Sequence, residues 1–185
     1  IPKKFPIILM ASRLIKDKGV EEFIKAAKYL KKKKFKGEFY LVGDVDFNNP
    51  SAVSKNLISL NHKKKILRYF KYRIDISKFI KKSTIVVLPS YREGFPKILM
   101  EAAACGRPII TTNVPGCKDA IINNKTGILV PPKNYKALGD AINKLSQDKK
   151  KIEKFASEAR KYAIANFSIK DVISKHILIY KKLNN

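Results

Sequence analysis

The chain has 185 residues, which fits one ordinary domain, and its 45% hydrophobic and 10% aromatic residues exclude a chain that is disordered throughout. The 40 Lys and Arg outnumber the 15 Asp and Glu, which gives a formal net charge of +25. A charge of this sign fits a nucleic acid, an anionic membrane surface or an anionic substrate as partner, and also compositional drift in a Lys-rich sequence. Because the Lys runs fall at predicted helix ends or in loops, we favour drift with weak surface attraction.

The sequence predicts strands that alternate with helices along most of the chain. Short apolar runs bounded by Pro, Gly or polar residues predict strands, and apolar residues at helical spacing predict helices. The predicted strands cover residues 7–11, 39–42, 66–70, 85–88, 108–112 and 127–130. The predicted helices cover residues 20–30, 51–60, 76–82, 96–104, 116–122, 135–145, 150–165 and 169–183, and Gly106 is expected to end the helix before it.

This order is typical of an α/β fold, a Rossmann-like parallel sheet with helices on both faces and further helices at the C-terminus. In such sheets, ligands bind at the carboxyl ends of the strands. That rule places residues 13–18, 43–44, 71–73, 90–95 and 113–116 around one rim of the predicted sheet.

Two carboxylates stand out in the stretch that follows the predicted strand 85–88. Glu93 lies in a turn between that strand and the next helix, and Glu101 lies eight positions on, about two helical turns along. Amides at a helix N-terminus face anions, and carboxylates accept hydrogen bonds from hydroxyl groups. The stretch therefore suits a polyhydroxylated, phosphate-bearing ligand, although an acid that complements the helix dipole beside a solvated Glu is an equally simple interpretation.

Arg13 and Lys18 follow the first predicted strand, five residues apart. A guanidinium and an ammonium from one loop can hold a diphosphate without a metal ion, although a basic loop is unremarkable in so basic a protein. Cys105 and Cys117 have no His at ligand spacing, so we expect no zinc site and two small, reduced core residues. The sequence shows neither an apolar run of membrane-spanning length nor a signal peptide.

Taken together, these motifs resemble those of the retaining glycosyltransferases of family 4, the group 1 class with the GT-B fold. The resemblance covers nearly the whole chain, and its most specific part is the Glu93 and Glu101 pair in the E-x7-E frame. The further matching pieces are residues 11–14 with Lys18-Gly19, residues 89–95, residues 106–110 and residues 127–130. The Phe95-Pro96-Lys97 variant is similar to the branch that builds capsules, O-antigen and glycans on lipid-linked carriers.

The resemblance implies a transfer of a sugar, with retention, from a nucleotide sugar, expected to be a UDP-sugar, to a glycan or lipid-linked acceptor. It implies that Arg13 and Lys18 hold the donor diphosphate and stabilise the leaving nucleotide, and that Glu101 binds the ribose hydroxyls. Glu93 is expected beside the donor sugar, with the amides of Gly94 and Phe95 on sugar or phosphate. The family pattern favours front-side attack, and a covalent adduct on Glu93 is the alternative. No metal or other cofactor is expected.

Two positions depart from the commonest family pattern. Pro96 stands where Gly is usual, which removes one amide donor but suits the first helical position, and Pro115-Gly116 replaces a Gly-Gly pair near the donor phosphates. We expect Gly116 to keep presenting its amide. Residues 1–185 are expected to form the nucleotide-sugar-binding domain, with the acceptor-binding N-terminal domain outside this chain and the last helix crossing back to it.

The cysteine usage predicts a reduced, cytoplasmic setting, and peripheral contact between the Lys-rich surface and the anionic inner face of a membrane is an additional hypothesis. A basic nucleic-acid-binding module is the alternative function, but it is supported by net charge alone, without helix-turn-helix, zinc-finger or aromatic RNA-binding patterns. An oxidoreductase domain that binds a dinucleotide fits the fold, yet no G-x-G-x-x-G follows the first predicted strand.

Overall fold

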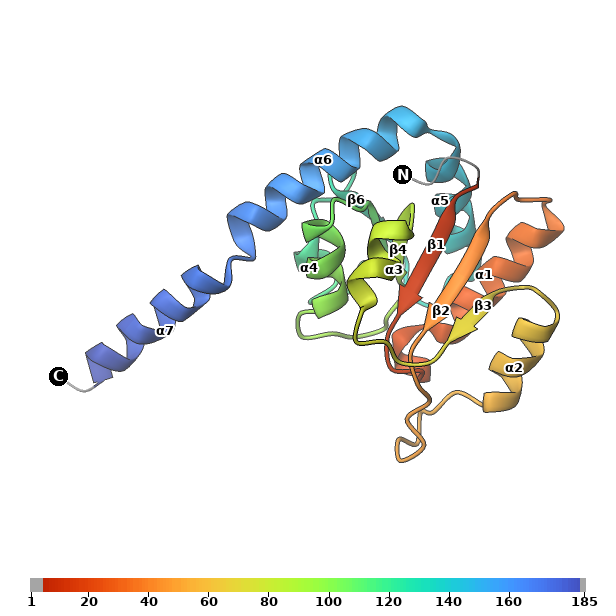
Figure 1. Ribbon diagram of the computed structural model, residues 1–185, viewed down its shortest axis with the longest axis horizontal. Coiled ribbons are helices and arrows are strands. Elements are labelled where there is room, and N and C mark those ends of the chain that lie inside the picture. The colour runs from red at the N-terminus through yellow and green to blue at the C-terminus, as the bar shows by residue number, and fades with distance from the viewer. Residues whose placement is uncertain (1–4, 184–185) are drawn as a thin grey trace.

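The protein is a parallel α/β domain, seen here as a computed structural model that describes residues 5–183 except the side chains of residues 171, 172 and 175. Within these residues, six strands form one sheet in the order β3-β2-β1-β4-β5-β6, and all neighbouring strands are parallel (Figure 1). The strands are β1 (Ile7–Ala11), β2 (Glu38–Val42), β3 (Arg68–Phe70), β4 (Ile85–Leu88), β5 (Ile109–Thr112) and β6 (Gly127–Val130). The fold class predicted from the sequence is confirmed.

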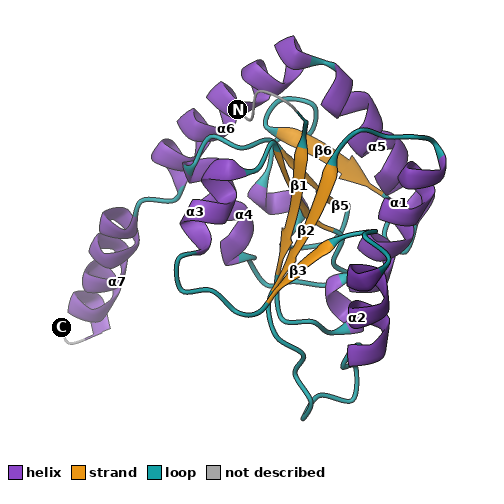
Figure 2. Ribbon diagram, turned by 45° about the vertical axis from the view of Figure 1, so that its right-hand side comes forward, coloured by secondary structure: helices purple, strands orange, loops and turns teal. Residues whose placement is uncertain are grey.

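Helices cover both faces of the sheet. Figure 2 shows α1, α2 and α5 on one side of the strands and α3 and α4 on the other. The helices are α1 (Val20–Lys32), α2 (Lys55–Lys63), α3 (Ile76–Lys82), α4 (Lys97–Ala104), α5 (Tyr135–Gln147), α6 (Lys149–Asn166) and α7 (Ile169–Leu183), with short 3-10 turns η1 (Lys16–Lys18) and η2 (Lys118–Ala120). Because the central strands β1 and β4 face helices on both sides, they read as continuous apolar runs, whereas the edge strand β3 begins with the exposed Arg68.

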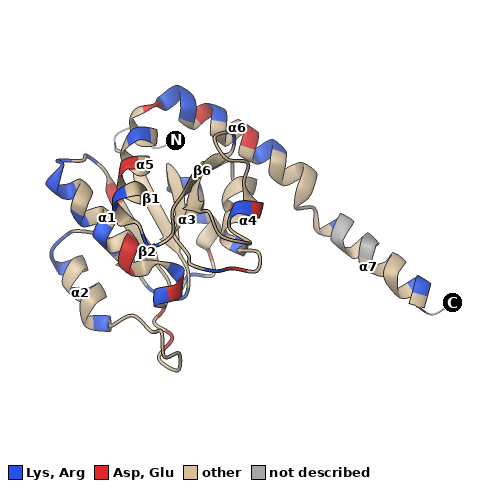
Figure 3. Ribbon diagram, turned by 180° about the vertical axis from the view of Figure 1, so that it is seen from behind, with Lys and Arg blue, Asp and Glu red and all other residues tan. Residues whose placement is uncertain are grey.

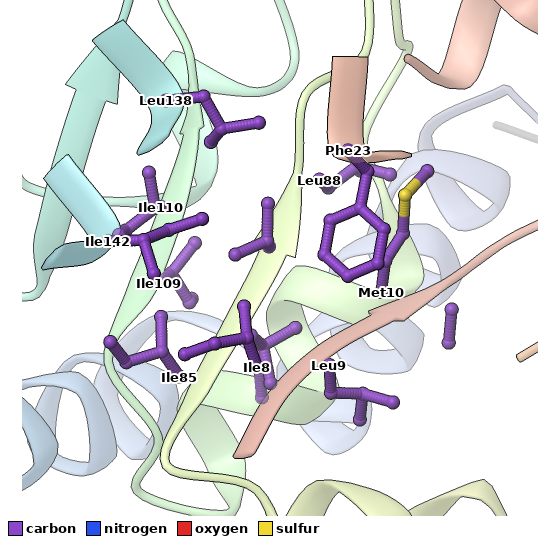
Figure 4. Close-up of a cluster of buried hydrophobic side chains, with 14 of the residues drawn as sticks. Ile8, Leu9, Met10, Phe23, Ile85, Leu88, Ile109, Ile110, Leu138 and Ile142 are labelled. Atoms are coloured by element: carbon purple, nitrogen blue, oxygen red, sulfur yellow. The ribbon is translucent and has the colours of Figure 1, made fainter. Parts of the chain in front are cut away.

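The core is built on the two central strands. Figure 4 shows side chains of β1 and β4 in one cluster with Phe23 of α1 and with residues of β5 and α5. Ile8, Leu9 and Met10 are fully buried, and Phe23 packs edge-on against Phe39 with ring centroids 5.6 Å apart. Burial of a large side chain of this kind contributes about 1.5–3 kcal/mol to stability, so the central strands are held firmly in place.

Helix α2 begins later than the sequence pattern indicates. Residues 51–53 run beside the loop after β1, where Lys16 donates its amide to the Ser51 carbonyl (2.7 Å) and Val53 donates to the Leu14 carbonyl (3.0 Å). The helix then starts after Ser54, whose hydroxyl accepts from the Asn56 amide at 3.2 Å. The predicted start at residue 51 was wrong because this long-range pairing competes with the helix.

The ends of the other elements follow local signals more closely. Gly106 has φ +60°, and its amide donates to the Ala103 carbonyl, so it ends α4 as predicted. Pro96 is the N-cap residue of α4 with extended dihedral angles, so the first helical residue is Lys97 and the prediction of Pro96 in that position was wrong. The helix predicted for residues 116–122 shrinks to the 3-10 turn η2.

The C-terminal helices differ from each other in their surroundings. Helix α6 packs against α4 and α5, whereas α7 extends away from the body of the molecule (Figure 1). The side chains of Ile173, Ile177 and Leu178 on α7 are 51%, 48% and 59% exposed. This confirms the expectation that apolar side chains of the last helix lie open in this chain. Within residues 5–183, no helix combines the length and apolar character needed to cross a membrane.

Gly19 allows the turn between η1 and α1 to pack under the end of β4. It has φ +74°, and a β-carbon at this position would collide with the Pro89 carbonyl. We predict that Gly19→Ala lowers the free energy of unfolding by more than about 2 kcal/mol, because backbone strain and a steric clash add together. Urea unfolding measures the change.

Gly94→Ala provides the matched control, because a β-carbon on Gly94 meets no atom within 4 Å. Its effect on the free energy of unfolding should stay within about 0.5 kcal/mol. Equal losses in the two variants would contradict this account of Gly19.

Candidate functional site

The candidate site lies where the order of the strands reverses. From β1 the chain passes through α1 to β2 on one side, and from β4 it passes through α4 to β5 on the other. The two connections leave in opposite directions, so a crevice opens between the carboxyl ends of β1 and β4. The loops of residues 12–19 and 89–96, which carry most of the predicted site residues, flank this crevice.

Asp17 joins these two loops. Its carbonyl accepts a hydrogen bond from the Ser90 hydroxyl and another from the Tyr91 amide, both at 2.8 Å. Its carboxylate accepts from the Arg92 guanidinium at 3.1 Å. Because Asp17 directly precedes Lys18 and Arg92 directly precedes Glu93, these bonds bring the predicted cation and the predicted acid to one point.

Lys18 and Glu93 form a close ion pair at this point. The ammonium donates to both carboxylate oxygens of Glu93 at 2.7 Å. The two side chains are 19% and 9% exposed, so solvent screens their attraction less than it screens a surface pair. The predicted site residues Lys18 and Glu93 are therefore in direct contact, which their separation in sequence did not reveal.

Arg13 and Glu101 line a neighbouring pocket of about 600 Å³. The Arg13 guanidinium lies 3.0 Å from a carboxylate oxygen of Asp46 and is 64% exposed, while Glu101 lies 3.6 Å from the ammonium of Lys97. The pocket also takes residues from the loops after β2 and β3, including the largely exposed side chains of Tyr72 and Ile74. A cation and a carboxylate beside apolar surface can hold a ligand with a phosphate, hydroxyl groups and a flat ring.

Gly94 and Phe95 stand between Glu93 and the start of α4. Among the described residues, neither amide donates a hydrogen bond, and both residues are exposed. Free amides just before a helix are suited to an anion. The Phe95 ring packs edge-on against the Phe167 ring, with ring centroids 5.6 Å apart.

Gly116 lies in the loop between β5 and η2. A β-carbon on it would collide with the carbonyls of Glu93 and Gly94, so its backbone lies directly against the Glu93 turn. Its amide donates to the Asp119 carboxylate at 2.9 Å. The prediction that Gly116 presents its amide to a ligand therefore requires Asp119 to release it. Burial raises the pKa of the neighbouring Cys117 thiol, which fits the predicted inert core residue.

Tyr91 holds the Glu93 loop to α1. Its hydroxyl donates to Glu22 at 2.5 Å, and Glu22 is a buried carboxylate with 7% exposure. The Lys133 ammonium lies over the Tyr91 ring, 5.1 Å from its centroid. Burial raises the pKa of Tyr91, and the Glu22 carboxylate raises it further. The hydroxyl therefore stays protonated and donates to Glu22 throughout the neutral range.

Sequence reasoning found the loops but missed several of the acids that organise them. Asp46, Glu22 and Asp119 were not predicted, and only Asp46, two residues after Asp44 at the end of a strand, had a usable signal. Within the described residues, no group of three His, Cys, Asp or Glu side chains is arranged to hold a metal ion. What the site offers is two cations for a diphosphate and two carboxylates for hydroxyl groups.

Comparisons with known proteins agree on one family. The family model "Glycosyl transferases group 1" matches residues 1–162. A relative from Campylobacter jejuni, N,N'-diacetylbacillosaminyl-diphospho-undecaprenol alpha-1,3-N-acetylgalactosaminyltransferase, is 34% identical over 97% of this chain and 46% of its own length. The UDP-Gal:alpha-D-GlcNAc-diphosphoundecaprenol alpha-1,3-galactosyltransferase of Escherichia coli is 30% identical over 77% of this chain and 37% of its own length.

Among solved structures, a glycosyltransferase from Rickettsia africae superimposes with a TM-score of 0.85 and 30% identity, over 100% of this chain and 49% of that one. This likeness confirms the Rossmann-like GT-B domain predicted from the sequence. The chain spans less than half the length of these two curated relatives.

The contact between Tyr91 and Glu22 is open to test. Tyr91→Phe leaves a buried carboxylate without its donor, so we predict a loss of about 1–3 kcal/mol in the free energy of unfolding at pH 7. The raised pKa means that the folded state keeps the hydroxyl proton above pH 10, where the unfolded state loses it. The contribution of the Tyr91 hydroxyl to stability is complete below pH 10 and is lost as the pH rises through the higher pKa of the folded state. The difference in free energy of unfolding between the parent and the variant therefore narrows in strong alkali.

Urea unfolding of both proteins between pH 7 and pH 11 measures this deficit. Tyr72→Phe is the control, because the Tyr72 ring is 69% exposed and its hydroxyl makes no hydrogen bond among the described residues. A deficit that is absent at pH 7, or that widens above pH 10, would show that Glu22 does not depend on Tyr91.

Proposed function

The chain belongs to the glycosyl transferases of group 1, and from this we propose that it is the domain that binds the nucleotide-sugar donor for transfer, with retention, to a glycan or lipid-linked acceptor. The donor is proposed to be a UDP-sugar, supported by the UDP-Gal in the name of the relative from Escherichia coli. A diphospho-undecaprenol acceptor in the names of both curated relatives supports a lipid-linked acceptor. The acceptor itself is proposed to bind a domain outside this chain.

The observation that carries the proposal is the placement of four side chains, in two pairs, on the segments that follow β1 and β4 at the switch point of the sheet. Lys18 contacts Glu93 beside the free amides of the Glu93 turn, and Arg13 and Glu101 line one pocket next to it. This arrangement fits a donor whose diphosphate lies against the two cations, whose ribose reaches Glu101 and whose sugar lies near Glu93. The base then enters the apolar part of the pocket beside Tyr72 and Ile74.

In the proposed reaction, the bond between the sugar and the diphosphate breaks and the acceptor hydroxyl attacks from the same face of the sugar. The hydroxyl proton passes to the departing phosphate oxygen. Negative charge grows on the leaving diphosphate, and Arg13 and Lys18 stabilise it without a metal ion. Glu93 orients the sugar through its hydroxyl groups in this scheme, without forming a covalent adduct. These chemical steps need the acceptor side, so the isolated chain is proposed to bind donor more readily than it turns it over.

Calorimetry with UDP and GDP tests the proposal directly. We predict that the folded domain binds UDP and that Glu101→Ala weakens binding about tenfold or more, because a charged acceptor of ribose hydroxyl hydrogen bonds is lost. Arg13→Ala should weaken the binding of UDP more than the binding of uridine, since uridine lacks the phosphates.

Lys118→Ala serves as the control for these variants, because Lys118 is an exposed cation on η2. It should leave UDP affinity unchanged. If neither UDP nor GDP binds the folded protein, or if Glu101→Ala binds as tightly as the parent, the donor-binding proposal fails.

A second proposal concerns a membrane. Six exposed lysines gather where α1 and α2 end, and we call this group the basic corner: Lys28, Lys31, Lys32, Lys63, Lys64 and Lys65 (Figure 3). The Lys31 ammonium donates to the carbonyls of Lys64 and Lys65, which ties the two helix ends together. None of the six forms an ion pair within the described part of the chain, and Leu60 among them is 48% exposed.

Unpaired lysines around an exposed apolar side chain suit an anionic bilayer surface, where a lipid-linked acceptor resides. We predict that the protein sediments with vesicles of phosphatidylglycerol and phosphatidylcholine but less with phosphatidylcholine alone. Replacing Lys28, Lys32 and Lys64 by Gln should reduce this sedimentation several-fold at 0.1 M salt, because each lysine near such a surface contributes about 1 kcal/mol.

The matched control replaces Lys118, Lys144 and Lys150, which removes the same charge from other exposed positions. Equal sedimentation with neutral and anionic vesicles, or equal loss in the two triple variants, would rule out the basic corner as the contact surface.

A further inference from the structure

Both cations assigned to the donor diphosphate already have a carboxylate partner. Lys18 contacts both oxygens of Glu93 at 2.7 Å, and Arg13 contacts Asp46 at 3.0 Å. The two pairs differ in burial, since Lys18 and Glu93 are 19% and 9% exposed while Arg13 and Asp46 are 64% and 28% exposed. A diphosphate therefore competes with a carboxylate at each cation, and the competition is stronger at the buried pair.

Glu93 has few ways to respond when Lys18 turns to another anion. Within the described residues, Lys18 is the sole hydrogen-bond donor to its carboxylate. The backbone on both sides is held, because Tyr91 and Arg92 are bonded to Asp17 and the Gly116 backbone lies against the Glu93 carbonyl. A carboxylate left without a partner in such a place is strongly unfavourable.

We propose that Glu93 is the resident counterion of Lys18 and that this pair makes the site distinguish the intact nucleotide sugar from the nucleoside diphosphate. The inference rests on the proposed function, because it assumes that Lys18 receives the diphosphate. The phosphates of an intact donor bind Lys18, and the hydroxyl groups of its sugar donate hydrogen bonds to the Glu93 carboxylate that Lys18 has released. The phosphates of a nucleoside diphosphate bind Lys18 in the same way, but this ligand leaves the Glu93 carboxylate without a hydrogen-bond donor.

The same carboxylate thus has opposite effects on the two ligands. It opposes the binding of a diphosphate that carries no sugar, and it favours a diphosphate that carries one. After transfer, the product nucleotide loses the sugar hydroxyls that satisfied Glu93, and the ion pair with Lys18 forms again. Glu93 is then a specificity-determining residue that promotes release of the nucleotide product.

The experiment compares the binding of UDP and inorganic pyrophosphate to the parent protein and to Glu93→Gln by calorimetry. The expected result is that UDP binds the variant about five- to twentyfold more tightly, because Lys18 is free from the start. The affinity for pyrophosphate should also be higher in the variant than in the parent. The affinity for UDP-galactose should rise less than that for UDP, because the variant also loses the carboxylate that accepts hydrogen bonds from the sugar hydroxyls.

Asp46→Asn is the matched control, since it frees the exposed Arg13 by the same loss of one negative charge. It should raise UDP affinity by a smaller factor than Glu93→Gln does, because solvent screens that pair. A Lys18→Met background should abolish the gain from Glu93→Gln, which separates release of Lys18 from a general change in charge. Glu93→Ala carries the same expectation as a second variant if the Gln variant does not fold.

Equal or weaker UDP binding by the folded Glu93→Gln variant overturns the inference while leaving donor binding by the parent intact. An equal gain for UDP and UDP-galactose overturns the assignment of Glu93 to the sugar hydroxyls. Absence of UDP, GDP and pyrophosphate binding in both the parent and the variants overturns the proposed function itself, and the inference with it.

Discussion

The pairing of β1 with β4 is the constraint on which the functional part of the molecule depends. Ile8 lies beside Ile85 and Leu9 beside Val86 in a parallel register, so both strands end at the same edge of the sheet. The loops that follow leave in opposite directions and open a crevice. The cations come from the loop after β1 and the acids from the loop and helix after β4, which is why neither half of the domain can form the site alone.

Charge is distributed unevenly over this very basic protein. The net charge is +25, yet several of its 15 acids lie at the edge where we propose that an anion binds, among them Asp17, Asp46, Glu93 and Glu101. Arg13, Lys18, Arg92 and Lys97 at this edge each have a close carboxylate, while the six lysines of the basic corner form no ion pair among the described residues. In the proposed binding mode, a diphosphate is held by exchange of partners at defined positions, and the overall positive field supplies mainly attraction at a distance.

Much of the fold was predictable because the central strands are buried on both faces and read as apolar runs. The bounds 85–88 and 127–130 were predicted as the structure has them, and the rim residues Arg13, Lys18, Glu93 and Glu101 followed from the rule for parallel sheets and from the family resemblance. The start of α2 was not predictable, since residues 51–53 take their hydrogen bonds from the distant loop at residues 14–16. The hydrogen bond between Tyr91 and Glu22 was not predicted for the same reason. Periodicity places Glu22 on a helix but does not identify the residue that its side chain contacts.

The ion pair between Lys18 and Glu93 joins residues 75 positions apart in the chain. Contacts between such distant residues require the closure of a large loop, and the entropic cost of that closure is paid before the contact contributes to stability. A partly folded chain with intact helices and a disordered central sheet therefore lacks the site altogether. Under the proposed function, the ability to retain a nucleotide would accordingly mark chains that have finished folding, and the ligand would stabilise those chains alone.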